Sequence, residues 1–182
     1  MSFEIRILAL LVFIGSMLLW DLKNPPDQRF RWKIYSFLLI AGGMGAAFGM
    51  LVDAMTSQIS IDYFIDGKGL AAGPGLRSRV LLLGAQAGFS GAVFGGCCYL
   101  VANRFKNNVA HLYMFLPIPL LTGVIMGAIL GIVQYWTDGI VLGDVNMLLG
   151  PDRAKYFIVV WMTHIGIYLG AGIGLIGSCV CI

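Results

Sequence analysis

The chain has 182 residues, of which 59% are hydrophobic and only 12% are charged, about half the charged share of a typical soluble domain. Its formal net charge of +3 is small and comes from no run of like charges. These values exclude a disordered protein, a basic nucleic-acid-binding protein and an ordinary soluble enzyme. They predict a single all-α integral membrane domain over residues 1–182, with membrane lipid as a partner and no nucleic acid.

Five segments are apolar enough to cross a bilayer, whose hydrocarbon core needs about 20 apolar residues per helix. The first segment is the weakest, because Glu4 and Arg6 leave an uncharged run only from Ile7 to Trp20. It is either a retained helix or a signal peptide, and the lack of an A-x-A-like cleavage site after it favours a retained helix. The predicted transmembrane helices are 4–21, 34–55, 80–102, 113–136 and 156–182.

The basic residues predict an orientation. Five spans place the connections 21–33 and 103–112 on the same side, where six Lys and Arg residues fall in two short loops. The opposite side also has six, but they are spread over longer segments. Short loops weigh most in the positive-inside rule, so we expect these two connections in the cytoplasm. The N-terminus is then outside and the C-terminus inside.

The second and third spans resemble the fourth and fifth. A shift of 82 residues aligns the two pairs without a gap, although some matches are expected by chance in a glycine-rich chain. A true duplication would make these helices a parallel hairpin repeat, related by a pseudo-twofold axis along the membrane normal. The matched glycines include Gly45 with Gly127, Gly49 with Gly131, Gly84 with Gly166, and Gly88 with Gly170.

Many glycines of the predicted spans also recur at four-residue spacing. Residues four apart lie on one helix face, and small side chains there let two helix backbones approach closely in lipid. The pattern indicates close packing, either within the chain or against a second copy or a partner subunit. The glycines concerned are Gly45, Gly49, Gly84, Gly88, Gly123, Gly127, Gly131, Gly166, Gly170 and Gly174.

Polar side chains within the predicted spans are few, and each is costly in hydrocarbon. In the predicted orientation they fall in the outer half of the membrane, which indicates a shallow pocket that opens outward. The alternative is that they form structural hydrogen bonds between helices. The inner half offers no polar path, which weighs against ion transport. The candidate pocket residues are Asp53, Gln86, Ser90, Gln134, His164 and Tyr168.

Four cysteines end the third and fifth spans on the same predicted side. Such thiols could bind zinc or an iron–sulfur cluster, but adjacent cysteines in apolar helices are more often small buried residues. One intramembrane histidine cannot supply bis-histidine haem ligation without a partner subunit. We therefore expect no metal or cofactor and only lipid contacts. The cysteines are Cys97, Cys98, Cys179 and Cys181.

The connection at residues 56–79 is rich in turn-forming residues, among them Gly73-Pro74-Gly75. It is either an amphipathic ledge at the membrane surface or a docking site for an external partner. The residues of the candidate docking loop are Asp62, Tyr63, Phe64 and Lys68.

Residues 59–64 read Ile-Ser-Ile-Asp-Tyr-Phe, and the last span carries a histidine four residues before Tyr-Leu-Gly. These motifs resemble those of an uncharacterised family of small multispanning bacterial membrane proteins, with a loop motif I-S-x-[DE]-Y-F and a last helix H-x-x-x-Y-L-G. This chain has Ile61 where the family typically has proline. The resemblance implies a bacterial cytoplasmic (inner) membrane. It also implies one outer-side feature formed by Asp62, Tyr63, Phe64, His164 and Tyr168.

The leading hypothesis from the sequence is an accessory or structural subunit of a membrane complex, packed through its glycine faces and without catalysis of its own. Its partners would be other membrane subunits or further copies of the chain. A second hypothesis is a small-molecule binding or transport component that uses the outward pocket. A third, an intramembrane enzyme with His164 as general base, has no accompanying nucleophile or metal set in its favour.

Overall fold

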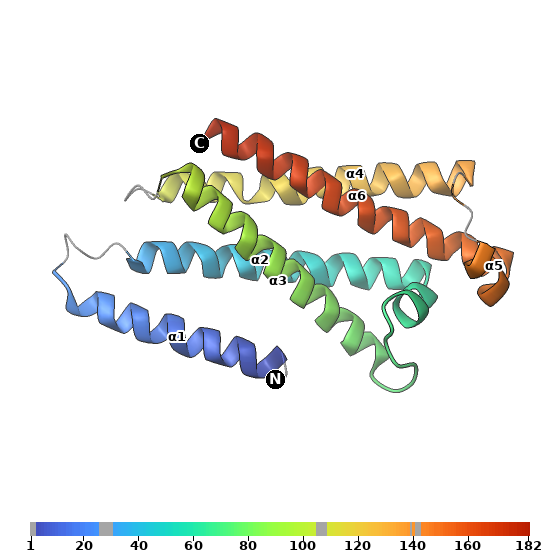
Figure 1. Cartoon of the computed structure of the whole chain (residues 1–182), viewed down its shortest axis with the longest axis horizontal. Helices are drawn as coiled ribbons and strands as arrows, with labels where there is room; N and C mark the ends of the chain where they lie inside the picture. Colours follow the sequence, from blue (N-terminus) through green and yellow to red (C-terminus); the bar gives the residue numbers. More distant parts are fainter. Residues whose placement is uncertain (1–2, 26–30, 105–108, 139, 141–142) are drawn as a thin grey trace.

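The computed structural model describes residues 3–25, 31–104, 109–138, 140 and 143–182, and within them the chain is all-helical without a strand. Five long helices run back and forth along the longest axis (Figure 1). They are α1 (Phe3–Lys23), α2 (Arg31–Ile59), α3 (Leu76–Ala102), α4 (Pro117–Thr137) and α6 (Pro151–Cys181). Three short elements connect them: η2 (Tyr63–Gly67), η3 (Ala110–Phe115) and α5 (Gly143–Leu149).

Four stretches of helix are long and apolar enough to cross a membrane: Trp32–Ile59, Leu76–Ala102, Ala110–Thr137 and Pro151–Cys181. Their outer faces carry large exposed apolar side chains such as Ile125, Ile132 and Ile176, which suit contact with lipid. The chain is therefore a membrane-embedded, multi-pass helical protein. The expected number of spans was five, whereas α1 forms a helix but is not among these four.

The helices α3 and α6 start earlier than the apolar segments that predict them, at Leu76 and Pro151. Charged residues occupy their first turns, and a helix tolerates these where it leaves the hydrocarbon. The residue before each helix is a glycine with positive φ, +76° at Gly75 and +77° at Gly150. Glycine adopts this left-handed backbone without a steric penalty, so it allows the chain to turn sharply into each helix.

The helices α2 and α3 form an antiparallel hairpin in which two glycines of one helix lie against two of the other. A methyl group added at Gly45, Gly49, Gly84 or Gly88 would overlap a carbonyl oxygen of the opposite helix. The two backbones are thus in direct contact. The four-residue spacing of the glycines predicted close packing, and in this hairpin that packing lies within the chain. In lipid, such contact stabilises a helix pair through van der Waals packing.

The helices α4 and α6 form a second antiparallel hairpin, built from glycine and threonine. Thr122 and Thr163 lie against glycines of the opposite helix, and each donates its hydroxyl hydrogen bond to a carbonyl of its own helix. Gly127 lies against Gly166, whereas a strict copy of the first hairpin would place it against Gly170. The second crossing is therefore displaced by one helical turn. The remaining glycines of this contact are Gly123, Gly131, Gly170 and Gly174.

The two hairpins meet through a buried cluster of apolar side chains at each end of the bundle. We call the group at the right of Figure 1 the η2 cluster: Tyr63, Phe64, Val80, Phe157, Ile158 and Val160. We call the group at the opposite end the C-terminal cluster: Phe37, Ala41, Tyr99, Leu100, Val109, Leu112 and Leu116, with Leu175 and Cys179 packed against it. Between these two ends the hairpins enclose a cavity.

Candidate functional site

A hydrogen bond links the two hairpins beside the η2 cluster. It joins Asp53 on α2 to His164 on α6, with 3.0 Å between Asp53 Oδ1 and His164 Nε2. Both side chains are less than one-tenth exposed. The other ring nitrogen of His164, Nδ1, lies 2.9 Å from the carbonyl oxygen of Val160 in the preceding turn of α6. The imidazole is therefore held from both sides.

These two contacts determine how many protons the Asp53–His164 pair holds. A carbonyl oxygen can only accept, so Nδ1 of His164 carries the proton that it donates to Val160. The bond between Nε2 and Asp53 then needs one more proton, which sits either on His164 as imidazolium or on Asp53 as carboxylic acid. The pair has no net charge in either case. An unpaired carboxylate at this position would carry a large desolvation cost.

The turn η2 covers the Asp53–His164 pair with two aromatic rings. The Tyr63 ring is stacked on the His164 imidazole, with 4.9 Å between centroids, and Phe64 meets the same imidazole edge-on at 6.1 Å. Both aromatic residues are buried. Burial, together with the negative charge of Asp53, raises the pKa of Tyr63 to about 12, so its phenol stays uncharged at neutral pH.

A second ion pair anchors η2 to the start of α6. Both the Nε and the Nη2 of Arg153 donate to the carboxylate of Asp62, which is a bidentate arrangement. Asp62 is buried, whereas Arg153 is largely exposed. This pair holds the loop against α6 and so directs Tyr63 and Phe64 inward. The sequence alone does not predict the Asp62–Arg153 pair, because residue spacing does not connect two residues 91 positions apart.

Lys68 adds a positive charge to the same end of the molecule. Its ammonium lies 5.4 Å from the centre of the Tyr63 ring, within the range of a cation–π interaction. It also lies near enough to the Tyr168 phenol to interact with it electrostatically. None of the ion pairs between described residues includes Lys68.

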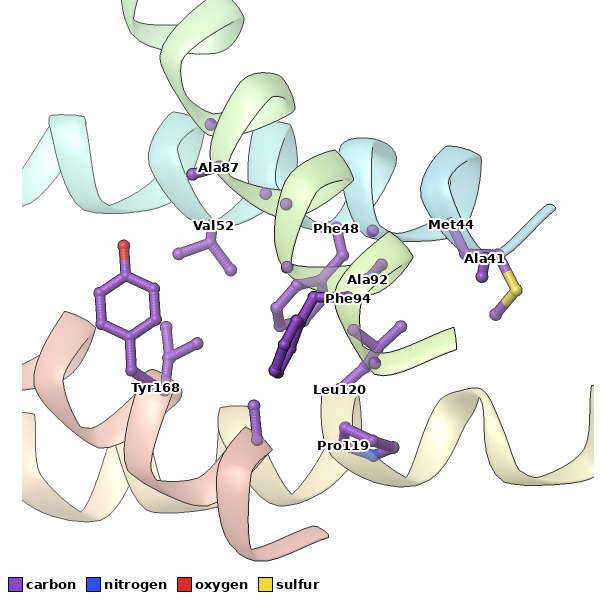
Figure 2. A pocket seen from close by; sticks show the side chains of 18 of the residues that line it. Ala41, Met44, Phe48, Val52, Ala87, Ala92, Phe94, Pro119, Leu120 and Tyr168 are labelled. Carbon is purple, nitrogen blue, oxygen red and sulfur yellow. The ribbon is translucent and has the colours of Figure 1, made fainter. Parts of the chain in front are cut away.

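A cavity of about 360 Å³ begins at these polar groups and continues between the hairpins. Its polar end is lined by Asp53, Lys68, His164 and Tyr168, and apolar residues and glycines make up most of the remaining wall. Figure 2 shows Phe48 on α2 extending into the space between the helices and the Tyr168 hydroxyl directed into the same space. The cavity is thus amphipathic, with its polar groups gathered at one end.

Three of the six predicted pocket residues come together here, namely Asp53, His164 and Tyr168. Gln134 is buried elsewhere, at the end of α4, where its side-chain amide both donates to and accepts from the backbone of Ile140. This pair of hydrogen bonds ties the end of α4 to the connection that follows it, so it is not one of the bonds between helices that the alternative predicts.

The other two predicted pocket residues lie on α3 and do not line the cavity. Gln86 is half-buried, and Ser90 is exposed and donates its hydroxyl to the Gln86 carbonyl at 2.8 Å. The helical face that they share therefore differs from the face that lines the cavity.

The candidate docking loop is turned largely inward. Tyr63 and Phe64 are part of the η2 cluster, Asp62 is paired with Arg153, and Lys68 lines the cavity. Docking through the two aromatic rings would require them to leave the protein interior. A docking role for this loop stays a prediction, and residues 66–69 and 71–75 are parts of it that offer exposed surface.

The four cysteines are free thiols in the structure. Cys98 and Cys179 are half-buried, whereas Cys97 and Cys181 are exposed. Within the described residues, no group of three or more His, Cys, Asp or Glu side chains is placed to hold a metal ion. The cysteines therefore do not form a four-ligand site in this conformation.

No known protein family matches the sequence, and comparisons with characterised proteins and with solved structures give no match either. The site is therefore interpreted through its own geometry. The two motifs that carry the sequence resemblance do lie together, since Tyr63 and Phe64 both contact His164.

Proposed function

We propose that the chain is a membrane-embedded binding protein for a lipid-like, amphipathic molecule, which occupies the cavity between the hairpins. The observation that carries this proposal is the division of the cavity wall into one polar end and a long apolar remainder. A volume of about 360 Å³ lies in the lower part of the range of small-molecule pockets, about 300–1,000 Å³.

Glycines give the cavity much of its space. A Cβ atom added at Gly91 on α3 or at Gly172 on α6 would meet no atom within 4 Å, and both residues line the cavity. The glycines of the hairpin contacts differ, because a Cβ there would overlap the opposite helix. The chain thus uses glycine for close contact within the hairpins and for open space between them.

The hypothesis of an accessory subunit loses its main support in this arrangement. It rested on glycine faces available for partners, but these faces contact other helices of the same chain. A subunit role stays a prediction, and purification in mild detergent tests it. A stable monomer without a co-purifying protein would count against it.

The binding proposal is tested by filling the cavity. Replacing Gly172 with leucine puts a side chain into the cavity without a clash at Cβ, and native mass spectrometry from mild detergent measures how much bound hexadecyl amphiphile remains. We expect Gly172→Leu to reduce retention at least tenfold. The matched control is Gly177→Leu on the same helix. A Cβ at Gly177 also meets nothing within 4 Å, but this residue does not line the cavity. Equal retention by the two variants would refute the proposal.

We further propose that α1 is a fifth span in a bacterial cytoplasmic membrane. The helix has 21 residues and lies antiparallel beside α2 (Figure 1). The buried carboxylate of Asp21 accepts a hydrogen bond from the Trp32 backbone at 2.9 Å, which ties the end of α1 to the start of α2. Reporter fusions at residues 2 and 25 test this: a fifth span places residue 2 outside and residue 25 in the cytoplasm, whereas without it both lie on the same side.

With five spans, the η2 end of the bundle faces outward and the cavity has its polar end on the outer side. The support is the density of basic residues in the two short connections, although Arg29 and Lys106 lie outside the described residues. The start of α2 and α4 at the same end of the bundle supports a parallel hairpin repeat (Figure 1). The crossings then diverged by one helical turn after duplication.

A further inference from the structure

We infer that the molecule in the cavity is a single-chain amphiphile with an anionic head group, a carboxylate or a phosphate, and that Lys68 binds this head. The inference rests on the proposed function and adds the class of ligand to it. Two independent observations carry it: the charge among the groups that line the polar end of the cavity, and the length and small volume of the apolar part.

The groups that line the polar end of the cavity carry one net positive charge. The Asp53–His164 pair is neutral, because its hydrogen bonds require a shared proton. The phenols of Tyr63 and Tyr168 are uncharged at neutral pH. Asp62 and Asp66 on the neighbouring turn both interact with Arg153, and none of these three residues lines the cavity. The ammonium of Lys68 is then the uncompensated charge among the described groups that line this end of the cavity, and it favours an anion.

The polar end also offers hydrogen bonds to an anion. Lys68 supplies three ammonium donors, and the Tyr168 hydroxyl, directed into the cavity in Figure 2, supplies another. Lys68 is exposed and its ammonium rests over the Tyr63 ring, so it can turn toward a head group without breaking an ion pair. A hydrogen bond to a charged group changes affinity by roughly tenfold or more.

The apolar part of the cavity is long, and the cavity as a whole is small. It is lined along α2 from Ala41 to Asp53, which is about 18 Å at the usual helical rise. Its volume of about 360 Å³ is near the lower end of the range of small-molecule pockets, about 300–1,000 Å³. A long site of small volume suits one extended hydrocarbon chain better than two acyl chains.

The test compares four probes on the full chain in phosphatidylcholine nanodiscs, by displacement of radiolabelled palmitate. Hexadecyl phosphate and palmitate have one chain and an anionic head, hexadecanol has the same chain and a neutral head, and dipalmitoylphosphatidylglycerol is an anionic membrane lipid with two chains. We expect the two single-chain anions to bind at least tenfold more tightly than hexadecanol and phosphatidylglycerol.

Lysine variants locate the head group. We expect Lys68→Gln to reduce the preference for hexadecyl phosphate over hexadecanol to about twofold or less, since one charge-assisted hydrogen bond is lost, and Lys68→Arg to keep most of it. The matched control is Lys155→Gln at the same end of the bundle, because Lys155 is paired with Asp138 and does not line the cavity. That control should bind as the wild type does.

Each other outcome overturns a defined part of the inference. Equal binding of hexadecyl phosphate and hexadecanol would refute the anionic head and leave the proposed function standing. An unchanged preference in Lys68→Gln would refute the role of Lys68. Phosphatidylglycerol binding as tightly as palmitate would refute the single chain and identify a membrane lipid as the ligand. If no probe, hexadecanol included, binds the wild type more than it binds Gly172→Leu, the proposed function itself fails.

Discussion

The contacts within each hairpin and the contacts between the two hairpins are built on different physical principles. Within the first hairpin, Gly45 and Gly49 bring the α2 backbone directly against the α3 backbone at Gly84 and Gly88. Between the hairpins, the described contacts include the two end clusters, the Asp53–His164 pair and the Asp62–Arg153 pair, and a cavity lies in the middle. The first kind of contact leaves no room for adjustment.

This difference indicates which part of the molecule can respond to a ligand. Each hairpin behaves as a rigid unit because a change in its crossing would force backbone atoms to overlap. The distance between the hairpins depends on contacts between side chains, so it can change at lower cost. The two kinds of contact can be broken separately, and four substitutions do so with effects that decrease in size.

The largest effect is expected from breaking the contact between the hairpins with His164→Leu. The substitution leaves Asp53 buried without its partner, and removal of one member of a buried pair costs about 3–5 kcal/mol of the free energy of unfolding. Chemical unfolding in mixed micelles measures the loss. The double variant His164→Leu with Asp53→Leu should recover much of it, because no polar group is then left unpaired. A double variant as unstable as the single one would contradict this explanation.

A smaller loss is expected from breaking a contact within a hairpin with Gly88→Ala. The added methyl group overlaps the carbonyl oxygen of Gly45, and overpacking of this kind costs about 1–3 kcal/mol. Gly43→Ala on α2 is the matched control, because a Cβ there meets nothing within 4 Å. It should leave stability unchanged or raise it by up to about 1 kcal/mol. Similar losses in both variants would show that the glycine contact does not stabilise the hairpin.

The third substitution, Asp53→Asn, keeps the shape of the pair but removes its need for a shared proton. The asparagine amide can donate to Nε2 of a neutral His164, so most of the contact survives. The groups that face the pair are Tyr63, Lys68 and Tyr168, and none of them is a second histidine or carboxylate.

We expect Asp53→Asn to lower the free energy of unfolding by only about 1 kcal/mol, because the hydrogen bond to His164 is kept and only its charge assistance is lost. Chemical unfolding in mixed micelles measures this loss. A loss as large as that of His164→Leu would contradict this explanation.

The smallest effect is expected at the anchor of η2. Arg153→Gln removes the partner of Asp62, but the guanidinium is exposed and partly screened by water. The melting temperature should fall less than in any variant above, and the difference from wild type should shrink in 1 M salt, where screening is strong. Lys155→Gln serves as the control for loss of an exposed ion pair nearby. If the difference in melting temperature does not change with salt, Arg153 stabilises the protein by packing and not by its charge.

The sequence predicts the helices well because hydrocarbon imposes a simple rule of length and polarity. It also identifies Asp53 and His164 as candidate site residues, because a polar side chain in hydrocarbon is costly unless it has a partner or a function. It does not predict that these two residues meet, because the spacing of a single chain says nothing about which faces of α2 and α6 oppose each other. Tyr63 and Phe64 show the same limit: as loop aromatics they suggest a surface role, but the Asp62–Arg153 pair directs them inward.

The Asp53–His164 pair has a consequence for how the protein enters the membrane. His164 follows Asp53 by 111 residues, so the α2–α3 hairpin is synthesised before its partner helix exists. Until α6 arrives, Asp53 must either take up a proton as a neutral acid or keep contact with water. Insertion of α6 supplies the imidazole and completes the bond between the hairpins. The bond at the polar end of the cavity therefore forms only after α2, α3 and α4 have been made.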